Sequence, residues 1–357
     1  MRSELIIHLS KLDNNLQAVK KRIKENVQVM AVVKDNAYGH GVIPIAKYLE
    51  PKVDWFCVAT IEEGIELREA AINVPILIFE SPRKEWISKY RQYGLTATVT
   101  DITDFKILEA GTEYHINFDT GMRRLGIPTE ELNSVIEEYK SYSEIHCTGI
   151  YTHYASADEP NNKSVSNQLE KFRVISKEFP DSLLRHTANT GAIFHYQNLD
   201  VQFDAVRAGV CLYGYAAGES KISDLESIVE WNSVIMQTRF IKRGETVGYG
   251  ESWAAPNDGI VGTIPIGYGD GVQRILSGKF KVEVNRKLVQ QVGRISMDYF
   301  GIYSAEQIFI KGDKVKIFNG ESLTPREWAK LAYTIPYEIT TSFNKKIERR
   351  FLKNNGL

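Results

Sequence analysis

Eight short apolar runs rich in β-branched residues follow one another in the first part of the chain, most of them separated by a helix-like segment. Near-continuous apolar runs of this length are typical of parallel strands covered on both faces. Eight strands alternating with helices predict a (β/α)8 barrel of the TIM type. An open, doubly wound sheet is the competing layout, but no GxGxxG motif follows the first run, which removes the usual dinucleotide-binding signature. The runs occupy residues 27–34, 55–60, 75–79, 95–99, 115–119, 148–153, 184–189 and 205–213.

The segments between the runs have polar starts and apolar residues at helical spacing. Residues 43–49, 61–70 and 168–179 are examples. A further helix is predicted directly after Ser10, whose hydroxyl is a suitable N-cap.

The pattern changes after residue 220. From residue 230 onward, alternating segments are punctuated by turn pairs such as Arg243-Gly244 and Asn319-Gly320, which indicates a mostly antiparallel β domain. We therefore predict a barrel over residues 10–220 and a β domain over residues 221–357. The strand-like residues 4–9 are a candidate to pair with the β domain.

Composition excludes several classes of protein. The 44 basic and 45 acidic residues give a net charge of −1, which argues against a nucleic-acid binder because phosphate neutralisation needs a basic surplus. No signal peptide is evident, and no stretch approaches the ~20 apolar residues of a membrane span. Cys57, Cys147 and Cys211 form neither a disulfide framework nor a CxxC metal pair. We expect a cytoplasmic enzyme or binding protein without a metal, although a domain cut from a larger membrane protein would have the same features.

Lys34 stands at the end of the first apolar run, and the C-terminal ends of the strands form the active-site face of a barrel. Apolar surroundings favour the neutral amine, which can form a Schiff base. The glycine-rich turn 39–41 offers backbone N–H groups to an anion, and Tyr38 adds a hydroxyl. The alternative interpretation is a lysine that reaches solvent from a strand end, beside a turn whose composition serves its conformation.

Four consecutive later strands also end in polar groups. A single buried histidine is usually a satisfied core residue, but arginine, histidine and asparagine at four successive strand ends are hard to assign to packing alone. Together they suit an anionic ligand that carries a phosphate and a ring nitrogen. The groups are Arg124 after the fifth run, His153 at the sixth, His186, Asn189 and Thr190 at the seventh, and Arg207 and Gly209 at the eighth.

Taken together, these motifs resemble those of the alanine racemase family, in which the lysine binds pyridoxal 5′-phosphate. One such motif is weak evidence, whereas eight in family order, covering essentially the whole chain, are strong. The resemblance implies a (β/α)8 barrel followed by a β domain, in agreement with the periodicity. The motifs are AVVKDNAYGHG (31–41), FDTGMRRLG (118–126), GIYTHYASADE (149–159), HTANTGA (186–192), VRAGVCLYG (206–214), VGYGESW (247–253), IPIGYGDG (264–271) and VGRISMD (292–298).

The resemblance implies racemisation of L-alanine to D-alanine, a peptidoglycan precursor, with pyridoxal 5′-phosphate as cofactor. Lys34 would bind the cofactor and act as the base on one face of the substrate carbon, and Tyr249 would act on the opposite face. In this family the second subunit completes each active site, so Tyr249 would come from the partner chain of a homodimer. Two bases suit racemisation, because a proton removed from one side has to return on the other.

The resemblance also assigns the cofactor's neighbours. Arg207 matches the arginine that faces the pyridine nitrogen, and its guanidinium stays protonated, so it cannot easily give that nitrogen a full proton. His153 and Arg207 match the polar neighbourhood that favours the phenolate of Tyr249. The phosphate would be held by Tyr38, Asn189, Thr190, Gly209 and the backbone amide of Val210.

On the substrate side, Arg124 resembles the arginine near the cofactor's phenolic oxygen and the substrate carboxylate. Tyr268, Met297 and Asp298 match the entrance and substrate side, which the partner subunit is expected to supply. For Tyr268, packing inside the β domain is the alternative interpretation.

Asn117 is a departure from the family. Many relatives have a lysine there, two residues before the aspartate of the DTG motif, and that lysine can be carbamylated to orient the nearby arginine. Asparagine cannot form a carbamate and carries no charge. We hypothesise that an anion, chloride for example, takes the place of the carbamate beside Arg124.

The second departure lies near the C-terminus, where many relatives have a tyrosine in a stretch resembling ISYRVPR. Counting from Glu338 places Lys345 at the tyrosine position, and a shift of one residue places Asn344 there. In either register the tyrosine is missing. Loss of its bulk would admit a larger side chain, so racemisation of serine or of a broad range of amino acids is the alternative to alanine.

Three other functions compete. A non-catalytic barrel protein that binds pyridoxal phosphate would lack the β domain that contains Tyr249. A decarboxylase of the same fold type typically has a cysteine motif in its C-terminal domain, and no cysteine follows Cys211 here. A sugar-phosphate barrel enzyme would explain the phosphate-binding groups but not the pairing of Lys34 with Tyr249.

Overall fold

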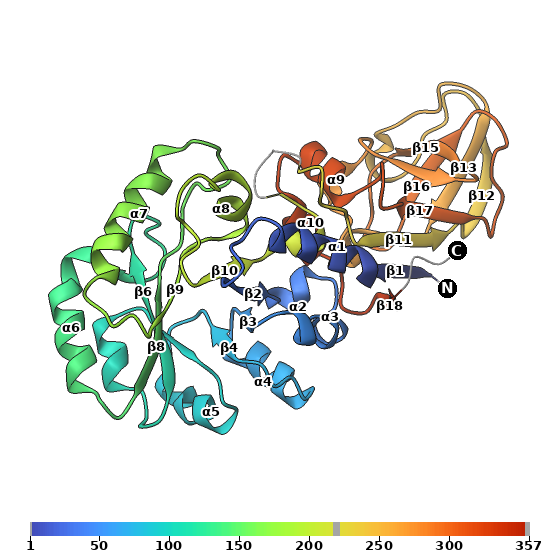
Figure 1. Ribbon diagram of the computed structural model, residues 1–357. Coiled ribbons are helices and arrows are strands. Elements are labelled where there is room, and N and C mark those ends of the chain that lie inside the picture. Colours follow the sequence, from blue (N-terminus) through green and yellow to red (C-terminus); the bar gives the residue numbers. More distant parts are fainter. Residues whose placement is uncertain (1, 217–221, 354–357) are drawn as a thin grey trace. The chain divides into compact units, whose positions relative to one another are not determined.

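The computed structural model describes residues 2–216 and 222–353 (Figure 1). The chain divides into two compact units. The barrel unit comprises residues 13–37 and 42–225, and the β unit comprises residues 1–12, 38–41 and 226–357. The boundary expected between residues 220 and 221 lies outside the described residues. The sequence pattern did not indicate that the four residues 38–41 belong with the β unit.

Eight parallel strands form the barrel unit, which confirms the predicted fold class. Each strand pairs with the next in the order β4-β3-β2-β10-β9-β8-β6-β5. A parallel bridge between Leu77 and Thr96 joins the two ends of this row and nearly closes it. The strands are β2 (Gln28–Val32), β3 (Trp55–Val58), β4 (Ile76–Ile78), β5 (Ala97–Val99), β6 (Glu113–Asp119), β8 (His146–Tyr151), β9 (Leu184–His186) and β10 (Ala205–Ala208), with the short β7 (Ile127–Pro128) paired to β6.

The strands are buried on both faces, as their continuous apolar runs predicted. All of β4 and β10 is buried, as are four of the five residues of β2. Helices lie outside the strands, as Figure 1 shows for α6 and α7. The helices after β2 are α2 (Lys34–Tyr38), α3 (Val42–Leu49), α4 (Ile61–Glu69), α5 (Ile87–Gln92), α6 (Leu132–Ser141), α7 (Lys163–Ser176) and α8 (Thr190–His195).

Helix α1 (Leu9–Lys20) begins one residue before the predicted cap. The prediction that Ser10 is the N-cap is therefore wrong, because Ser10 is the second residue of the helix. The chain passes directly from the last residue of β1, His8, into α1, so no separate capping position exists between strand and helix.

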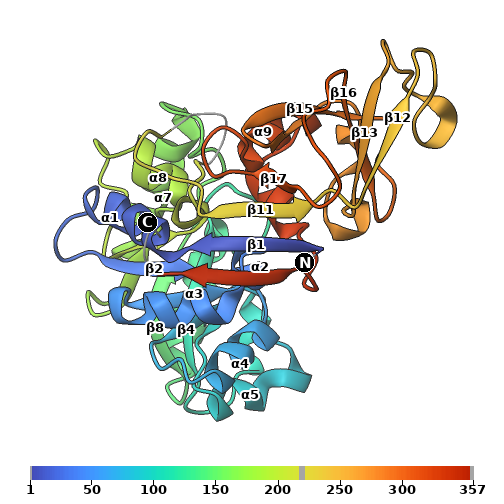
Figure 2. The ribbon, with the colours of Figure 1, turned by 90° about the vertical axis from the view of Figure 1, so that its right-hand side faces the viewer.

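The β unit is built on one sheet with the strand order β12-β13-β16-β15-β14-β17-β11-β1-β18. The N-terminal strand β1 (Ser3–His8) lies between β11, to which it is antiparallel, and β18, to which it is parallel (Figure 2). The other strands are β11 (Val229–Val234), β12 (Gln237–Ile241), β13 (Gly259–Ile264), β14 (Lys281–Val284), β15 (Lys287–Val292), β16 (Phe300–Ser304), β17 (Lys314–Phe318) and β18 (Glu348–Leu352), with helices α9 (Pro325–Ala332) and α10 (Pro336–Thr341).

An aromatic cluster forms the core of the β unit around Trp231 of β11. The Trp231 ring centroid lies 5.3 Å from that of Phe343 and 6.0 Å from that of Trp328. Trp231 and Trp328 are almost fully buried. Burying side chains of this size contributes much of the unit's stability.

Candidate active site

Lys34 lies two residues beyond the end of β2 and opens a strained turn. Asp35, Asn36, Ala37 and Tyr38 all have φ between 52° and 55°, which is left-handed helical backbone. For residues with a Cβ this conformation costs about 1–2 kcal/mol each. Strain of this kind persists only where surrounding contacts enforce it, and it is concentrated at functional sites.

Side-chain oxygens hold the turn in place. Both oxygens of the Glu63 carboxylate accept backbone N–H groups, one from Asp35 and the other from Ala59 at 2.8 Å. Asn36 Oδ1 accepts the N–H of Val42 at 2.9 Å. Glu63 belongs to the capping box of α4, so the start of that helix and the turn after Lys34 share one carboxylate.

Arg207, from β10, is the centre of a buried polar network. Its Nη1 donates to Nδ1 of His186 at 2.6 Å and to the carbonyl of His186 at 2.9 Å. Its Nη2 donates to the carbonyls of Thr152 at 2.7 Å and Thr187 at 3.1 Å. All three nitrogens of a guanidinium donate hydrogen bonds. In Arg207 both Nη atoms have acceptors, and Nε has none among the described residues.

The arginine determines the tautomers of two buried histidines. Arg207 can only donate, so Nδ1 of His186 is an acceptor and its Nε2 carries the proton. That proton is donated to Nδ1 of His115, 2.9 Å away, so the proton of neutral His115 is on Nε2. Nε2 of His115 is buried and has no hydrogen-bond partner among the described residues.

His153 lies on the other side of Arg207. Its Nδ1 is 3.3 Å from Nη2 of Arg207, and its Nε2 is 3.3 Å from Nδ2 of Asn189. Neutral imidazole has one acceptor nitrogen, so only one of these long contacts is a hydrogen bond to His153.

Burial and positive neighbours keep these histidines neutral. Burial is the main factor that lowers the pKa of His153, followed by the charges of Arg207, Arg124 and Lys34. Burial and Arg207 lower the pKa of His115 to about 3, and the pKa of His186 is lowered in the same way. Lys34, Arg124 and Arg207, predicted from three separate strand ends, are therefore all near enough for their charges to act on one buried histidine.

Thr190, Gly209 and Val210, predicted as phosphate ligands, lie close together. Thr190 is the first residue of α8, with Asn189 as N-cap, and its Oγ1 accepts the N–H of Gly209 at 3.3 Å. Val210 opens the short 3₁₀ helix η5 (Val210–Tyr213), where the first N–H groups have no acceptor within the helix. Backbone N–H groups at such a position suit a phosphate.

The loop that carries Arg124 is fixed by Asp119. The Asp119 carboxylate accepts the N–H of Gly121 at 2.8 Å and that of Arg123 at 3.0 Å. The Arg124 side chain is exposed. Asn117 lies on β6, the strand that ends at Asp119. It is buried, and its Oδ1 has no hydrogen-bond partner among the described residues.

The remaining predicted site residues are in the β unit. Tyr249 opens the 3₁₀ helix η6 (Tyr249–Glu251), and 70% of its surface is exposed. It lines a hollow of about 420 Å³ together with Arg294, Ser296 and Tyr299. Tyr249 therefore lies near the loop that contains Met297, and its ring is accessible.

Tyr268 and Met297 belong to two loops that are joined through their backbones. The N–H of Tyr268 donates to the carbonyl of Ser296 at 3.0 Å, and that of Gly269 to the carbonyl of Met297 at 2.9 Å. A Cβ on Gly267 would lie only 2.2 Å from the Ser296 carbonyl oxygen, so this approach requires glycine. Tyr268, Met297 and Asp298 are all exposed.

Tyr38 lies in the β unit with the C-terminal segment. Its ring packs edge-on against that of Tyr337, with centroids 6.3 Å apart. Asn344 donates from Nδ2 to the carbonyl of Gly269 at 2.7 Å, and its Oδ1 accepts the N–H of Lys346 at 2.9 Å. Asn344, and not the exposed Lys345, is therefore the residue that contacts the Tyr268 turn.

Three residues of these networks were not predicted from the sequence. His115 was placed on a strand but not in the site, although its position two residues before Asn117 aims it to the same side of β6. Arg294, inside the VGRISMD motif, lines the hollow beside Tyr249. Arg2 contacts the Tyr268 and Met297 loops, and no local pattern in the sequence indicates this.

The residues present fit pyridoxal 5′-phosphate. Lys34 supplies the amine, and Arg207 retains one N–H without an acceptor for a ring nitrogen. Thr190 and the N–H of Val210 suit the phosphate. Within residues 2–216 and 222–353, no cluster of three or more His, Cys, Asp or Glu residues is arranged to hold a metal ion. In the same ranges no helix has the length and apolar character to cross a membrane.

Comparison with known proteins gives one family along the whole chain. Residues 7–217 match the model "Alanine racemase, N-terminal domain" and residues 228–351 match "Alanine racemase, C-terminal domain". The chain is 34% identical to the alanine racemase of Treponema denticola over 98% of both proteins. The structure of alanine racemase from Clostridium difficile superposes with a TM-score of 0.93 at 30% identity, covering 99% of this chain and 97% of that one. The Bartonella henselae alanine racemase, described with covalently bound pyridoxal phosphate, superposes with a TM-score of 0.89 at 28% identity, covering 99% and 100%. This chain therefore belongs to the alanine racemase family, whose members are amino-acid racemases.

Proposed function

We propose that this chain interconverts L- and D-alanine with pyridoxal 5′-phosphate, using Lys34 and Tyr249 as the two bases. The observation that carries the proposal is the strained turn at Lys34, beyond the end of β2. The adjacent strand β10 supplies Arg207, and the segments after β8 and β6 supply His153 and Arg124. The match to alanine racemases along the whole chain supports the same reaction.

The barrel unit would hold the cofactor. Lys34 would carry it covalently, Arg207 would face its ring nitrogen, and Thr190 and Val210 would hold its phosphate. When bound, the cofactor withdraws electrons and so makes the proton on the substrate Cα acidic. Arg207 would donate a hydrogen bond but keep its proton, because a guanidinium is a far weaker acid than a protonated ring nitrogen.

The two bases would act from opposite sides of the substrate carbon. Nζ of Lys34 would take or return a proton on one face, and Oη of Tyr249 on the other. Tyr249 is mostly exposed in the described chain, as expected for a group that works in the site of another subunit. The active unit would then be a homodimer in which the partner also supplies Tyr268, Met297 and Asp298.

Arg124 would bind the substrate carboxylate, and Asn117 would take part in an anion site beside it. A buried amide oxygen with no donor is costly. The same amide turned by 180° presents its NH₂ group, a donor that fits a halide. Bromide soaking should give anomalous density beside Asn117, and a site that stays empty would contradict the anion.

Alanine is favoured over serine by the position of Asn344. Its amide nitrogen donates to the carbonyl of Gly269, and its oxygen accepts the N–H of Lys346. Both polar groups of the residue that replaces the family's tyrosine are therefore bonded within the chain and not to a serine hydroxyl. A ratio of kcat/KM for L-alanine over L-serine well above one is expected. Equal values would favour the broad-spectrum alternative.

Complementation between two inactive variants tests the shared site. Lys34→Ala should carry no borohydride-fixed cofactor on its peptide by mass spectrometry, and Tyr249→Phe should exchange the Cα proton of only one antipode in deuterated water. Mixed and refolded together, the two variants form some heterodimers with one intact site, so activity should return. If Lys34 and Tyr249 acted within one chain, mixing would restore nothing. Wild-type racemisation by Tyr249→Phe would contradict the two-base assignment.

A further inference from the structure

Arg2, the residue before β1, is fixed to the sheet through its backbone. Ser233 Oγ donates to the Arg2 carbonyl at 2.7 Å. The next residue, Ser3, pairs with Ser233 in the β1–β11 ladder, and its hydroxyl accepts the indole N–H of the buried Trp231 at 2.7 Å. The Arg2 side chain therefore starts from a rigid point.

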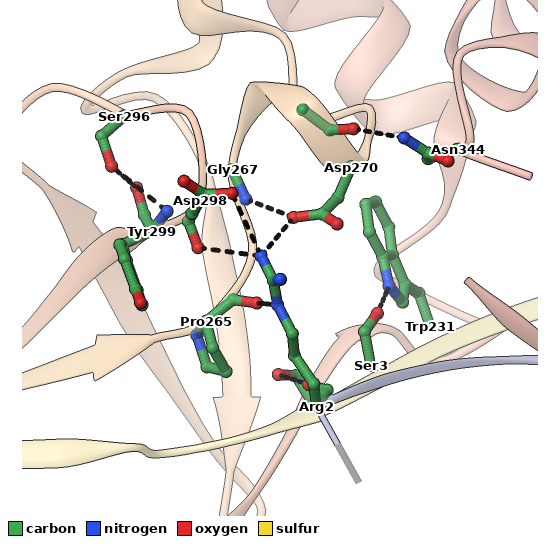
Figure 3. Close-up of polar contacts among 12 residues, drawn as sticks. Arg2, Ser3, Trp231, Pro265, Gly267, Asp270, Ser296, Asp298, Tyr299 and Asn344 are labelled. Carbon is green, nitrogen blue, oxygen red and sulfur yellow. Dashed lines mark hydrogen bonds and ion pairs between the residues drawn. The ribbon is translucent and has the colours of Figure 1, made fainter. Parts of the chain in front are cut away.

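The guanidinium of Arg2 ends between the two loops that carry Tyr268 and Met297 (Figure 3). Its Nε donates to the carbonyl of Pro265 at 2.7 Å, and its Nη2 lies 3.3 Å from the Asp270 carboxylate. The same Nη2 is 3.5 Å from both the carbonyl and the carboxylate of Asp298. Pro265 and Asp270 flank Tyr268, and Asp298 follows Met297, so one side chain contacts both loops.

The contacts of Arg2 include ion pairs as well as hydrogen bonds. Asp270 and Asp298 both approach one nitrogen of Arg2, so removing the guanidinium would leave two carboxylates near each other without the cation between them. The Asp270 side chain is only 17% exposed, which reduces screening by water. Its Oδ2 also accepts the N–H of Gly267 at 3.0 Å, so a displaced carboxylate would disturb the start of the Tyr268 turn.

We propose that Arg2 is a positioning residue that sets the separation of the 265–271 and 296–298 loops and so places Tyr268 and Met297 for the substrate. This rests on the proposed function, in which those two side chains line the substrate side of the partner's site. The backbone bonds between the loops are made by Tyr268 and Gly269 at their point of contact. Arg2 acts elsewhere, on Pro265, Asp270 and Asp298.

Kinetics of Arg2→Ala separate positioning from a general loss of folding. The KM for alanine should rise about fivefold while kcat changes less than about twofold, since the ion pairs are half exposed and the reacting groups untouched. Arg2→Lys should recover part of the loss, because it restores the charge but not the two-pronged contact. Adding Asp270→Asn to Arg2→Ala should also lower KM again, since the amide oxygen still accepts from Gly267 and the repulsion is gone.

Arg350→Ala is the matched control. Arg350 pairs with Glu4 of the same sheet at 2.9 Å and bonds to neither loop. Its loss should cost comparable stability and leave KM unchanged. An equal rise of KM in both variants, or no rise in Arg2→Ala, would overturn the proposal.

Hydrogen exchange measured by mass spectrometry tests Arg2 without relying on activity. Exchange in peptides covering 265–271 and 296–298 should be faster in Arg2→Ala than in the wild type and in Arg350→Ala. Unchanged exchange in both loops would overturn the positioning role. If the wild type failed to racemise alanine, the proposed function would fall, and exchange would still decide whether Arg2 holds the loops.

Discussion

Nη1 of Arg207 and Nδ1 of His186 are 2.6 Å apart, and this hydrogen bond sets the protonation of a buried histidine pair. The arginine always donates, so His186 must donate in turn to His115. Arg207 is thus a buried cation whose charge opposes protonation of the neighbouring imidazoles. The network holds Arg207 in one orientation before any ligand binds.

Replacing His186 should weaken this orientation. In His186→Leu, Nη1 of Arg207 loses one acceptor and keeps only the backbone carbonyl, which costs about 1–3 kcal/mol for a buried donor. The melting temperature should fall by several degrees, and the affinity for pyridoxal phosphate, measured by titration of the apoenzyme, should fall with it. His186→Gln offers an amide oxygen to Arg207 and should keep more of both. Identical losses in the two variants would show that size, and not the acceptor, matters at this position.

Acid should destabilise the barrel through the same histidines. The pKa of His115 is about 3 in the folded chain and about 6.5 when unfolded, so its neutral form contributes stability in full above pH 6.5. That contribution is lost as the pH falls from 6.5 toward 3, at about 1.4 kcal/mol per pH unit for each such proton. Urea midpoints measured over this range should fall less steeply for His115→Gln. Parallel curves for variant and wild type would rule out this linkage.

Glu63 should influence how well Lys34 retains the cofactor, although Glu63 is not in contact with the reacting atoms. Glu63→Gln leaves one acceptor oxygen where two N–H groups, from Asp35 and Ala59, need one each. The left-handed turn should relax, and the fraction of chains that retain borohydride-fixed cofactor on Lys34 should drop. Glu62→Gln, at the exposed neighbour in the same helical turn, should behave as wild type. A drop in both variants would point to helix α4 as a whole.

Gly267→Ala should separate the Tyr268 and Met297 loops. The backbone of Gly267, with φ −148°, accepts any residue, but the new Cβ would meet the Ser296 carbonyl oxygen at 2.2 Å. KM for alanine should rise more than in Arg2→Ala, since the two backbone bonds between the loops are broken. Gly278→Ala is the control, because its Cβ meets no atom within 4 Å and only the positive φ of 77° is unfavourable. A similar KM in the two glycine variants would contradict the steric argument.

The eight barrel strands were predictable from the sequence, and the same runs located several of the residues proposed for the site. Burial on both faces requires continuous apolar runs, so the runs locate the strands, and the parallel topology brings their C-terminal ends to one face. Lys34 and His153 were singled out because each ends such a run, Arg207 because it lies within one, and Arg124 because it lies shortly after one. Local patterns of this kind depend on neighbouring residues and can be read without knowing the fold.

Only the tertiary structure decided which distant groups bond. Arg2 meets Asp270 and Asp298 more than 260 positions away, Asn344 and not Lys345 contacts the Tyr268 turn, and residues 38–41 join the β unit. The tautomers of His186 and His115 follow from one 2.6 Å bond to Arg207. Hydrogen bonds and ion pairs depend on distances and directions that arise once sheets and loops have packed, so their geometry leaves no periodic trace in the sequence.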